Sequence, residues 1–169
     1  LIQKMNEKAK KLSKENIIVD GHIDLPFRLY KENLLEEENI NLNKNTSGNF
    51  DTYKAKKGGL NCPFMAIYTP SEKSENESYT FANSLIDLVN NVIKSNKEFD
   101  YAFTPKDVIK NFKKNKISLP MGMENGSPIG KDINRIKYFF DRGIRYMTLT
   151  HAADNQICCL LYTSDAADD

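Results

Sequence analysis

Short apolar segments alternate with longer amphipathic segments along most of this chain, and this alternation restricts the folds that it can adopt. A strand followed by a helix and then by another strand builds a parallel sheet with helices packed on its faces. The chain is therefore predicted to be an α/β protein. The expected strands are residues 17–20, 61–69, 101–103, 117–123 and 144–150.

Helical periodicity marks most of the segments around these strands. One helix is expected at residues 1–15 and another at 105–115, where Thr104 and Pro105 suit an N-cap and a first helical position. A longer helix is expected after the polar loop that follows Pro70. Its apolar stripe consists of Phe81, Leu85, Leu88 and Val92.

Two further segments differ in their pattern. Residues 130–142 carry Ile133, Ile136 and Phe140 at helical spacing, so we expect a helix with these three side chains facing the core. Residues 31–50 are dense in Glu and Asn and lack apolar periodicity, which indicates a loop or a surface insertion.

Composition excludes several classes of function. The 169 residues, 40% of them hydrophobic, can bury one core, and a net charge of +1 gives no general basis for binding nucleic acid. No apolar stretch approaches the roughly 20 residues that cross a bilayer. The three cysteines match neither a zinc knuckle nor a disulfide framework. We expect free thiols and a cytoplasmic location, and a signal upstream of Leu1 stays an open alternative.

The chain has only two histidines, His22 and His151, and both end predicted strands. His22 and Asp24 lie two residues apart, so an extended backbone points both side chains to one side, where they can bind one metal ion. The alternative is a turn in which Asp24 accepts a hydrogen bond from a backbone amide and His22 is solvated. Asp20 can orient His22 or form a turn of its own.

Glu124 follows the strand predicted at 117–123, and His151 follows the one at 144–150. Taken singly, Glu124 suits a turn carboxylate, and His151 suits a strand-end histidine with its hydrogen bonds satisfied. In barrels of parallel strands, however, active sites lie at the carboxyl ends of the strands. Together with His22 and Asp24, these residues predict a shared metal site.

These segments resemble, in their order and spacing, the membrane dipeptidase (renal dipeptidase) family of zinc metallopeptidases. The resemblance covers about residues 14–158. It implies a TIM-like (β/α)8 barrel of the metal-dependent hydrolase type, of which a chain of this length holds about the N-terminal half. The matching segments are Val19-Asp20-Gly21-His22-Ile23-Asp24-Leu25-Pro26, Gly58-Gly59, Gly122-Met123-Glu124-Asn125-Gly126 and Tyr146-Met147-Thr148-Leu149-Thr150-His151.

The resemblance also implies roles for the site residues. His22 and Asp24 would bind the first of two zinc ions, Glu124 would bridge both ions, and His151 would stabilise the oxyanion. A hydroxide that bridges the two ions would attack the peptide carbonyl of a dipeptide. A carboxylate suits the bridging position, because a neutral imidazole offers only one lone pair.

The chain departs from the family in three respects. The two later histidines that hold the second zinc ion are absent, so we expect this fragment by itself to be inactive. Asn125 stands where many relatives have glycine. Residues 159–169 match no part of the expected fold. The expected organisation is thus an N-terminal helix (1–16), a partial dipeptidase domain (17–158) and a non-native tail (159–169).

Two other functions stay open. A related amide or ester hydrolase, such as a lactonase or deacetylase, would use a similar barrel, but such enzymes usually carry His-x-His where this chain has Asp24. A non-catalytic binding protein on the same fold is the other alternative. The expected partners are a dipeptide substrate and, in the intact protein, a second copy in a homodimer.

Overall fold

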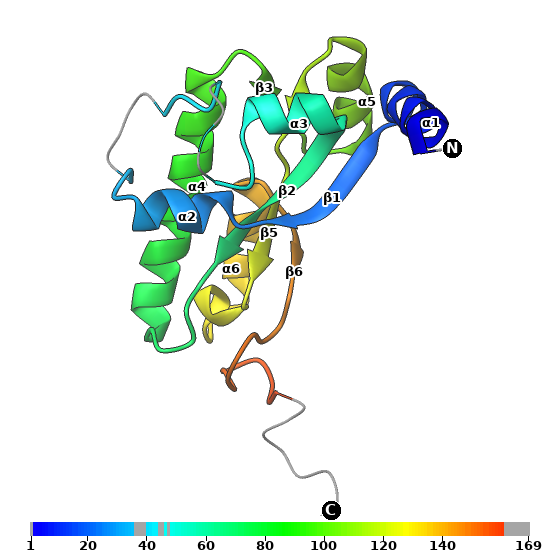
Figure 1. The fold of residues 1–169 in the computed structure, drawn as a ribbon. Coiled ribbons are helices and arrows are strands. Elements are labelled where there is room, and N and C mark those ends of the chain that lie inside the picture. Colours follow the sequence, from blue (N-terminus) through cyan, green and yellow to red (C-terminus); the bar gives the residue numbers. More distant parts are fainter. Residues whose placement is uncertain (1, 36–39, 44–45, 47, 161–169) are drawn as a thin grey trace, which may run out of the picture.

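Four parallel strands form the central sheet in the computed structural model, which describes residues 2–35, 40–43, 46 and 48–160. A second sheet pairs two short strands, β3 (Phe99–Asp100) and β4 (Ile117–Ser118), also in parallel. The predicted α/β class with parallel strands is confirmed. The central strands follow the order β1 (Ile18–Ile23), β2 (Leu60–Tyr68), β5 (Met121–Glu124) and β6 (Ile144–Met147) (Figure 1).

Helices precede or connect these strands. The predicted N-terminal helix is α1, which lies at the periphery of the molecule, at the upper right of Figure 1. Helices α2 and α3 were not predicted from the pattern, because seven residues are too few to show helical periodicity. No helix in the described ranges is long and apolar enough to span a membrane. The helices are α1 (Ile2–Glu15), α2 (Leu25–Lys31), α3 (Thr52–Gly58), α4 (Glu75–Ser95), α5 (Pro105–Lys113), the 3-10 helix η1 (Ser127–Ile129) and α6 (Asn134–Asp141).

Helix α4 provides a large part of the core. It begins with a capping box, in which the Ser74 hydroxyl accepts from the Glu77 backbone N–H and the Glu77 carboxylate accepts from the Ser74 N–H. Its predicted apolar stripe is confirmed, since all four side chains are buried in the core that also contains the sheet residues Met65, Ile67 and Met123.

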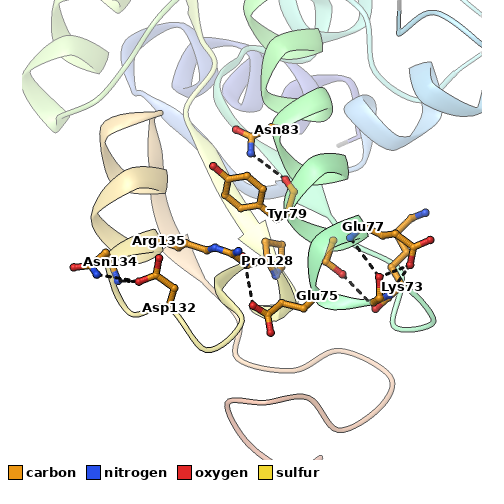
Figure 2. A network of polar contacts seen from close by, with 11 residues as sticks. Lys73, Glu75, Glu77, Tyr79, Asn83, Pro128, Asp132, Asn134 and Arg135 are labelled. Carbon is orange, nitrogen blue, oxygen red and sulfur yellow. Dashed lines mark hydrogen bonds and ion pairs between the residues drawn. The ribbon is translucent and has the colours of Figure 1, made fainter.

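A polar network joins the start of α4 to the segment between β5 and α6 (Figure 2). Arg135 donates through Nη1 to Glu75 Oε1 and to the carbonyl of Pro128, both at 3.3 Å. The Arg135 guanidinium also lies over the Tyr79 ring, 4.5 Å from its centroid. The segment that follows β5 is thereby tied to α4.

All five predicted strands have different bounds in the structure. The strand predicted at 17–20 continues to Ile23, and the one predicted at 61–69 lies at Leu60–Tyr68. The strand predicted at 117–123 is divided into β4 and β5, because Pro120 has no N–H to donate to a sheet. The strand predicted at 101–103 lies earlier, at Phe99–Asp100, and the strand predicted at 144–150 ends at Met147.

The predicted inward face of the last helix is wrong. Ile133, Ile136 and Phe140 are 72%, 45% and 55% exposed, whereas Phe139 is buried. Helix α6 is short and follows η1, and it packs against the core through Phe139 beside Ile129. Within the described residues, no strand or helix follows β6 to cover the other face of α6.

Residues 31–50 contain irregular backbone in their described part, but they are not a surface insertion. Ile40, Leu42 and Phe50 are all buried. The buried side chain of Asn96 accepts from the Leu42 N–H at 3.0 Å and donates to the Ile40 carbonyl at 2.7 Å. This segment is therefore part of the packed domain.

The buried carboxylate of Asp51 caps α3 and is expected to make stability depend on pH. It accepts from the backbone N–H groups of Lys54 and Thr46, both at 2.8 Å. Burial alone would raise the pKa of Asp51, but these hydrogen bonds outweigh burial and lower it to about 2. Because the pKa is lowered on folding, this stabilisation is present above the ordinary value of 3.8 and is lost as the pH falls toward 2.

We expect Asp51→Asn to lower the free energy of unfolding by about 2 kcal/mol at pH 7 and by clearly less at pH 3, measured by urea unfolding. The control is Asp141→Asn, on the exposed end of α6, which should cost less than about 0.5 kcal/mol. An equal loss for Asp51→Asn at both pH values would contradict the assigned pKa.

Candidate metal centre

Strand β1 brings His22 and Asp24 to one site. Its pairing with β2 is irregular between Asp20 and Ile23, and Asp20 Oδ1 accepts from the His22 backbone N–H at 3.0 Å, so the Asp20 carboxylate bonds the backbone at this irregularity. Asp24 is the N-cap residue of α2, yet its carboxylate makes no capping hydrogen bond. It lies 3.2 Å from His22 Nε2 instead. The alternative in which Asp24 binds a backbone amide therefore does not describe this site.

Glu124 connects these two residues to His151. It is the last residue of β5, two strands away from β1, and its Oε2 lies 3.3 Å from His22 Nε2. Its other oxygen, Oε1, lies 3.4 Å from His151 Nε2. His151 is on the segment after β6 rather than at the end of the strand. The structure thus brings together all four residues that the sequence singles out.

Three of the four residues fit the requirements of a metal ion. One ligand atom from each of His22, Asp24 and Glu124 lies within 4.8 Å of the others, and this is the one such group among the described residues. Tetrahedral zinc, with bonds of about 2.0–2.1 Å to N and O, places neighbouring ligand atoms roughly 3.3 Å apart. The two distances from His22 Nε2, 3.2 and 3.3 Å, match that spacing. Three protein ligands leave a position open for water, as in catalytic zinc sites.

The cluster opens into a cleft of about 580 Å³ that Asp24, Glu124 and His151 line together with Phe27 and Tyr68. The Tyr68 ring contacts His151 edge to face, with centroids 4.9 Å apart, and contacts Phe27 in the same way at 5.0 Å. The sequence analysis missed Tyr68. The available signal was its position as the last residue of β2, where it pairs with Glu124 of β5.

The surroundings of Tyr68 disfavour the ionised form of its phenol. Burial raises the pKa of its phenol, and the negative charges of Glu72, Glu124 and Asp24 raise it further. The Tyr68 hydroxyl is a hydrogen-bond donor at neutral pH, as a phenol ordinarily is, and the raised pKa extends that state to higher pH.

Tyr146 of β6 supports the backbone that carries His22. Its hydroxyl donates to the Gly21 carbonyl at 2.8 Å, so the side chain reaches from β6 to β1. The ring passes over Gly122 of β5, where an added Cβ would come within 2.0 Å of the ring. Gly122 thus leaves the space that the Tyr146 ring needs to reach Gly21, the residue before His22 on β1.

The fold is an α/β fold with parallel strands. The carboxyl ends of these strands carry an imidazole and two carboxylates, which is the kind of site that metal-dependent hydrolases use. The chain belongs to the membrane dipeptidase family, peptidase family M19, whose model matches residues 6–164. The family resemblance stated from the sequence is confirmed. The match includes residues 159–164, the start of the expected non-native tail. The domain bounds stay a prediction, and residues 161–169 lie outside the described residues.

Known proteins similar to this chain agree with the family. Mouse dipeptidase 3 is 26% identical over 147 residues, which are 87% of this chain and 29% of the mouse protein. Rat dipeptidase 3 is 25% identical over 87% of this chain and 30% of the rat protein. The chain thus spans less than a third of these curated relatives.

Solved structures show the same fold. The probable dipeptidase PvdM from Pseudomonas aeruginosa superposes with a TM-score of 0.78 at 18% identity, covering 90% of this chain and 39% of PvdM. A metallopeptidase from Rhodobacter sphaeroides, liganded with a phosphinate mimic of the dipeptide L-Ala-D-Ala, superposes with a TM-score of 0.72 at 21% identity. The match covers 82% of this chain and 46% of the metallopeptidase. The described elements therefore form part of a metallodipeptidase fold, as expected for the N-terminal portion of a TIM-like barrel.

Proposed function

We propose that the protein containing this chain hydrolyses dipeptides with the help of zinc. The observation that carries the proposal is the convergence of His22, Asp24 and Glu124, with His151 beside them, at the carboxyl ends of parallel strands. Membership of the membrane dipeptidase family supports it. Because the chain spans only part of its relatives, the activity is assigned to the whole protein.

In this proposal, bound zinc supplies an activated water as nucleophile and polarises the substrate carbonyl. His22 and Asp24 would hold the first ion. Glu124 would bind beside them through Oε2, which lies 3.3 Å from His22 Nε2, and its second carboxylate oxygen would serve to bridge to a second ion. The remaining ligands of a second ion would come from residues outside this chain.

His151 acts on the substrate in this proposal. Its side chain is 38% exposed and lines the cleft, while the contacts with Glu124 and Tyr68 fix its ring. A donor held in this way can meet the negative charge that develops on the carbonyl oxygen as the nucleophile attacks. No other imidazole in the chain is placed for this role, because the only other histidine, His22, is assigned to metal.

A dipeptide is the proposed substrate class. The structurally similar metallopeptidase from Rhodobacter sphaeroides is liganded with a phosphinate mimic of the dipeptide L-Ala-D-Ala, which supports a substrate of that size. A cleft of about 580 Å³ lies within the size range of small-molecule sites.

The whole protein provides the test of activity. We expect the zinc-loaded enzyme to cleave dipeptides, to leave tripeptides and lactones intact, and to lose activity on chelation and regain it with zinc. Turnover of lactones or acetylated amines without turnover of dipeptides would replace the proposal with a related hydrolase. Zinc-independent behaviour and no turnover of any substrate would favour a binding protein.

The isolated chain provides the test of the zinc assignment. We expect residues 1–169 to bind one zinc ion, measured by isothermal titration and metal analysis, and to show weak dipeptide turnover or none. Two tightly bound ions with ordinary turnover would show that the chain contains a complete centre, which contradicts the proposal.

A further inference from the structure

Asn125, the residue after Glu124, has a backbone conformation that few side chains adopt. Its φ of 73° lies in the left-handed region, where Gly and Asn are tolerated best. The residue is only 1% exposed, so its amide must find hydrogen-bond partners inside the protein.

The hydrogen bonds of Asn125 join the ends of three strands. Its Nδ2 donates to the carbonyl of Thr69, directly after β2, at 2.9 Å. Its backbone N–H donates to Thr148 Oγ1, directly after β6, also at 2.9 Å. Asn125 itself directly follows β5. Its hydrogen bonds therefore join the carboxyl ends of three of the four central strands, β2, β5 and β6.

The same side chain fixes the segment that carries His151. Asn125 Oδ1 accepts from Asn155 Nδ2 at 3.0 Å, and Asn155 Nδ2 also donates to the Leu149 carbonyl at 2.6 Å. The Gly126 N–H donates to the same Leu149 carbonyl at 3.1 Å. His151 lies between these two anchored positions, so its segment is held on both sides.

The other side of Asn125 is anchored as well. Its Oδ1 accepts from the hydroxyl of Ser127 at 2.8 Å, and the carbonyl of the next residue, Pro128, accepts from Arg135 in the network of Figure 2. The position of Asn125 is thereby fixed relative to α4 and α6.

We propose that Asn125 is a positioning residue that sets the placement of His151 relative to Glu124. A buried amide with partners on both sides has one favourable orientation, and it transmits that orientation to the metal ligand before it and to the segment 148–155. The inference deepens the proposed function and rests on it for the roles of Glu124 and His151. The coupling itself can be measured without metal.

The experiment uses nuclear magnetic resonance of the metal-free chain, whose two histidines give two sets of ring signals that the His22→Gln variant assigns. Asn125→Gly keeps the left-handed backbone and removes every side-chain bond. We expect it to abolish the cross-peak between the rings of His151 and Tyr68, and to raise the zinc dissociation constant about 10-fold.

Two further variants separate the possible causes. Asn115→Gly is the matched control, because Asn115 also has a positive φ, of 56°, but lies exposed at the end of α5, and both readouts should stay unchanged. Asn155→Ala should abolish the ring contact yet leave the zinc dissociation constant within about twofold, since Asn125 keeps its bonds to Thr69 and Ser127.

A purely structural role would lower the melting temperature of Asn125→Gly while the folded variant keeps the ring contact and the zinc affinity, and that result would overturn the proposal. If Asn125→Gly does not fold, Asn155→Ala decides, and an unchanged ring contact in that variant would likewise overturn it. Failure of the unsubstituted chain to bind zinc would count against the proposed function alone, because the ring contact is measured without metal.

Discussion

Replacement of Glu124 by glutamine should lower the zinc affinity of the chain at least about 100-fold, because it removes a charged ligand rather than a residue that only orients one. The neutral amide also places an N–H₂ group near His22 or His151, whose Nε2 atoms lie 3.3 and 3.4 Å from the two carboxylate oxygens. In the whole enzyme, the same change should abolish dipeptide turnover. Isothermal titration with zinc measures the first effect, and a steady-state assay measures the second.

The matched control is Glu32→Gln, because Glu32 lines the same cleft but is not part of the ligand group. Its zinc dissociation constant should stay within about twofold of the unsubstituted chain, as expected for an exposed charge. An unchanged affinity in Glu124→Gln would remove Glu124 from the metal site and leave only His22 and Asp24, too few for a specific zinc centre.

Substitution of Gly122 by valine should destabilise the fold by about 3 kcal/mol, measured by urea unfolding. A Cβ at this position would lie 2.0 Å from the Tyr146 ring, so the ring must leave and its hydroxyl must release the Gly21 carbonyl. Because Gly21 directly precedes His22, zinc affinity should fall as well.

The control places the same side chain on β1, two strands away from β5 in the same sheet. At Gly21 an added Cβ would meet nothing within 4 Å, so Gly21→Val should change the unfolding free energy by no more than about 0.5 kcal/mol. In addition, Tyr146→Ala combined with Gly122→Val should recover part of the stability that Gly122→Val loses. No recovery would show that the ring does not cause the strain.

Local sequence patterns predicted much of the fold. The N-cap at Thr104, the proline at the first helical position of α5 and the apolar stripe of α4 were predicted and are all present. These features depend on residues that lie within a few turns of each other, so a single sequence contains the signal. The same reasoning failed for α6, where helical spacing identified an apolar face but could not show which face the core would cover.

The candidate site could be predicted as a set of residues but not as a geometry. His22, Asp24 and Glu124 stand at strand ends and His151 on the segment after one, which is a local property. The supporting contacts depend instead on which strands become neighbours. Examples are the Tyr146 hydroxyl on the Gly21 carbonyl and the Asn125 amide on the Thr69 carbonyl, which join residues far apart in the chain.

The order of strands in the central sheet also has a consequence for folding kinetics. Each parallel pairing closes a long loop, and the entropic cost of closure rises with loop length. The shortest of these connections joins β5 to β6 through residues 125–143, whereas residues 24–59 and 69–120 separate the other pairs. We therefore expect the β5–β6 unit to form first. His22 and Glu124 belong to strands on opposite sides of β2, so the ligand cluster should be completed only when β1 joins the sheet.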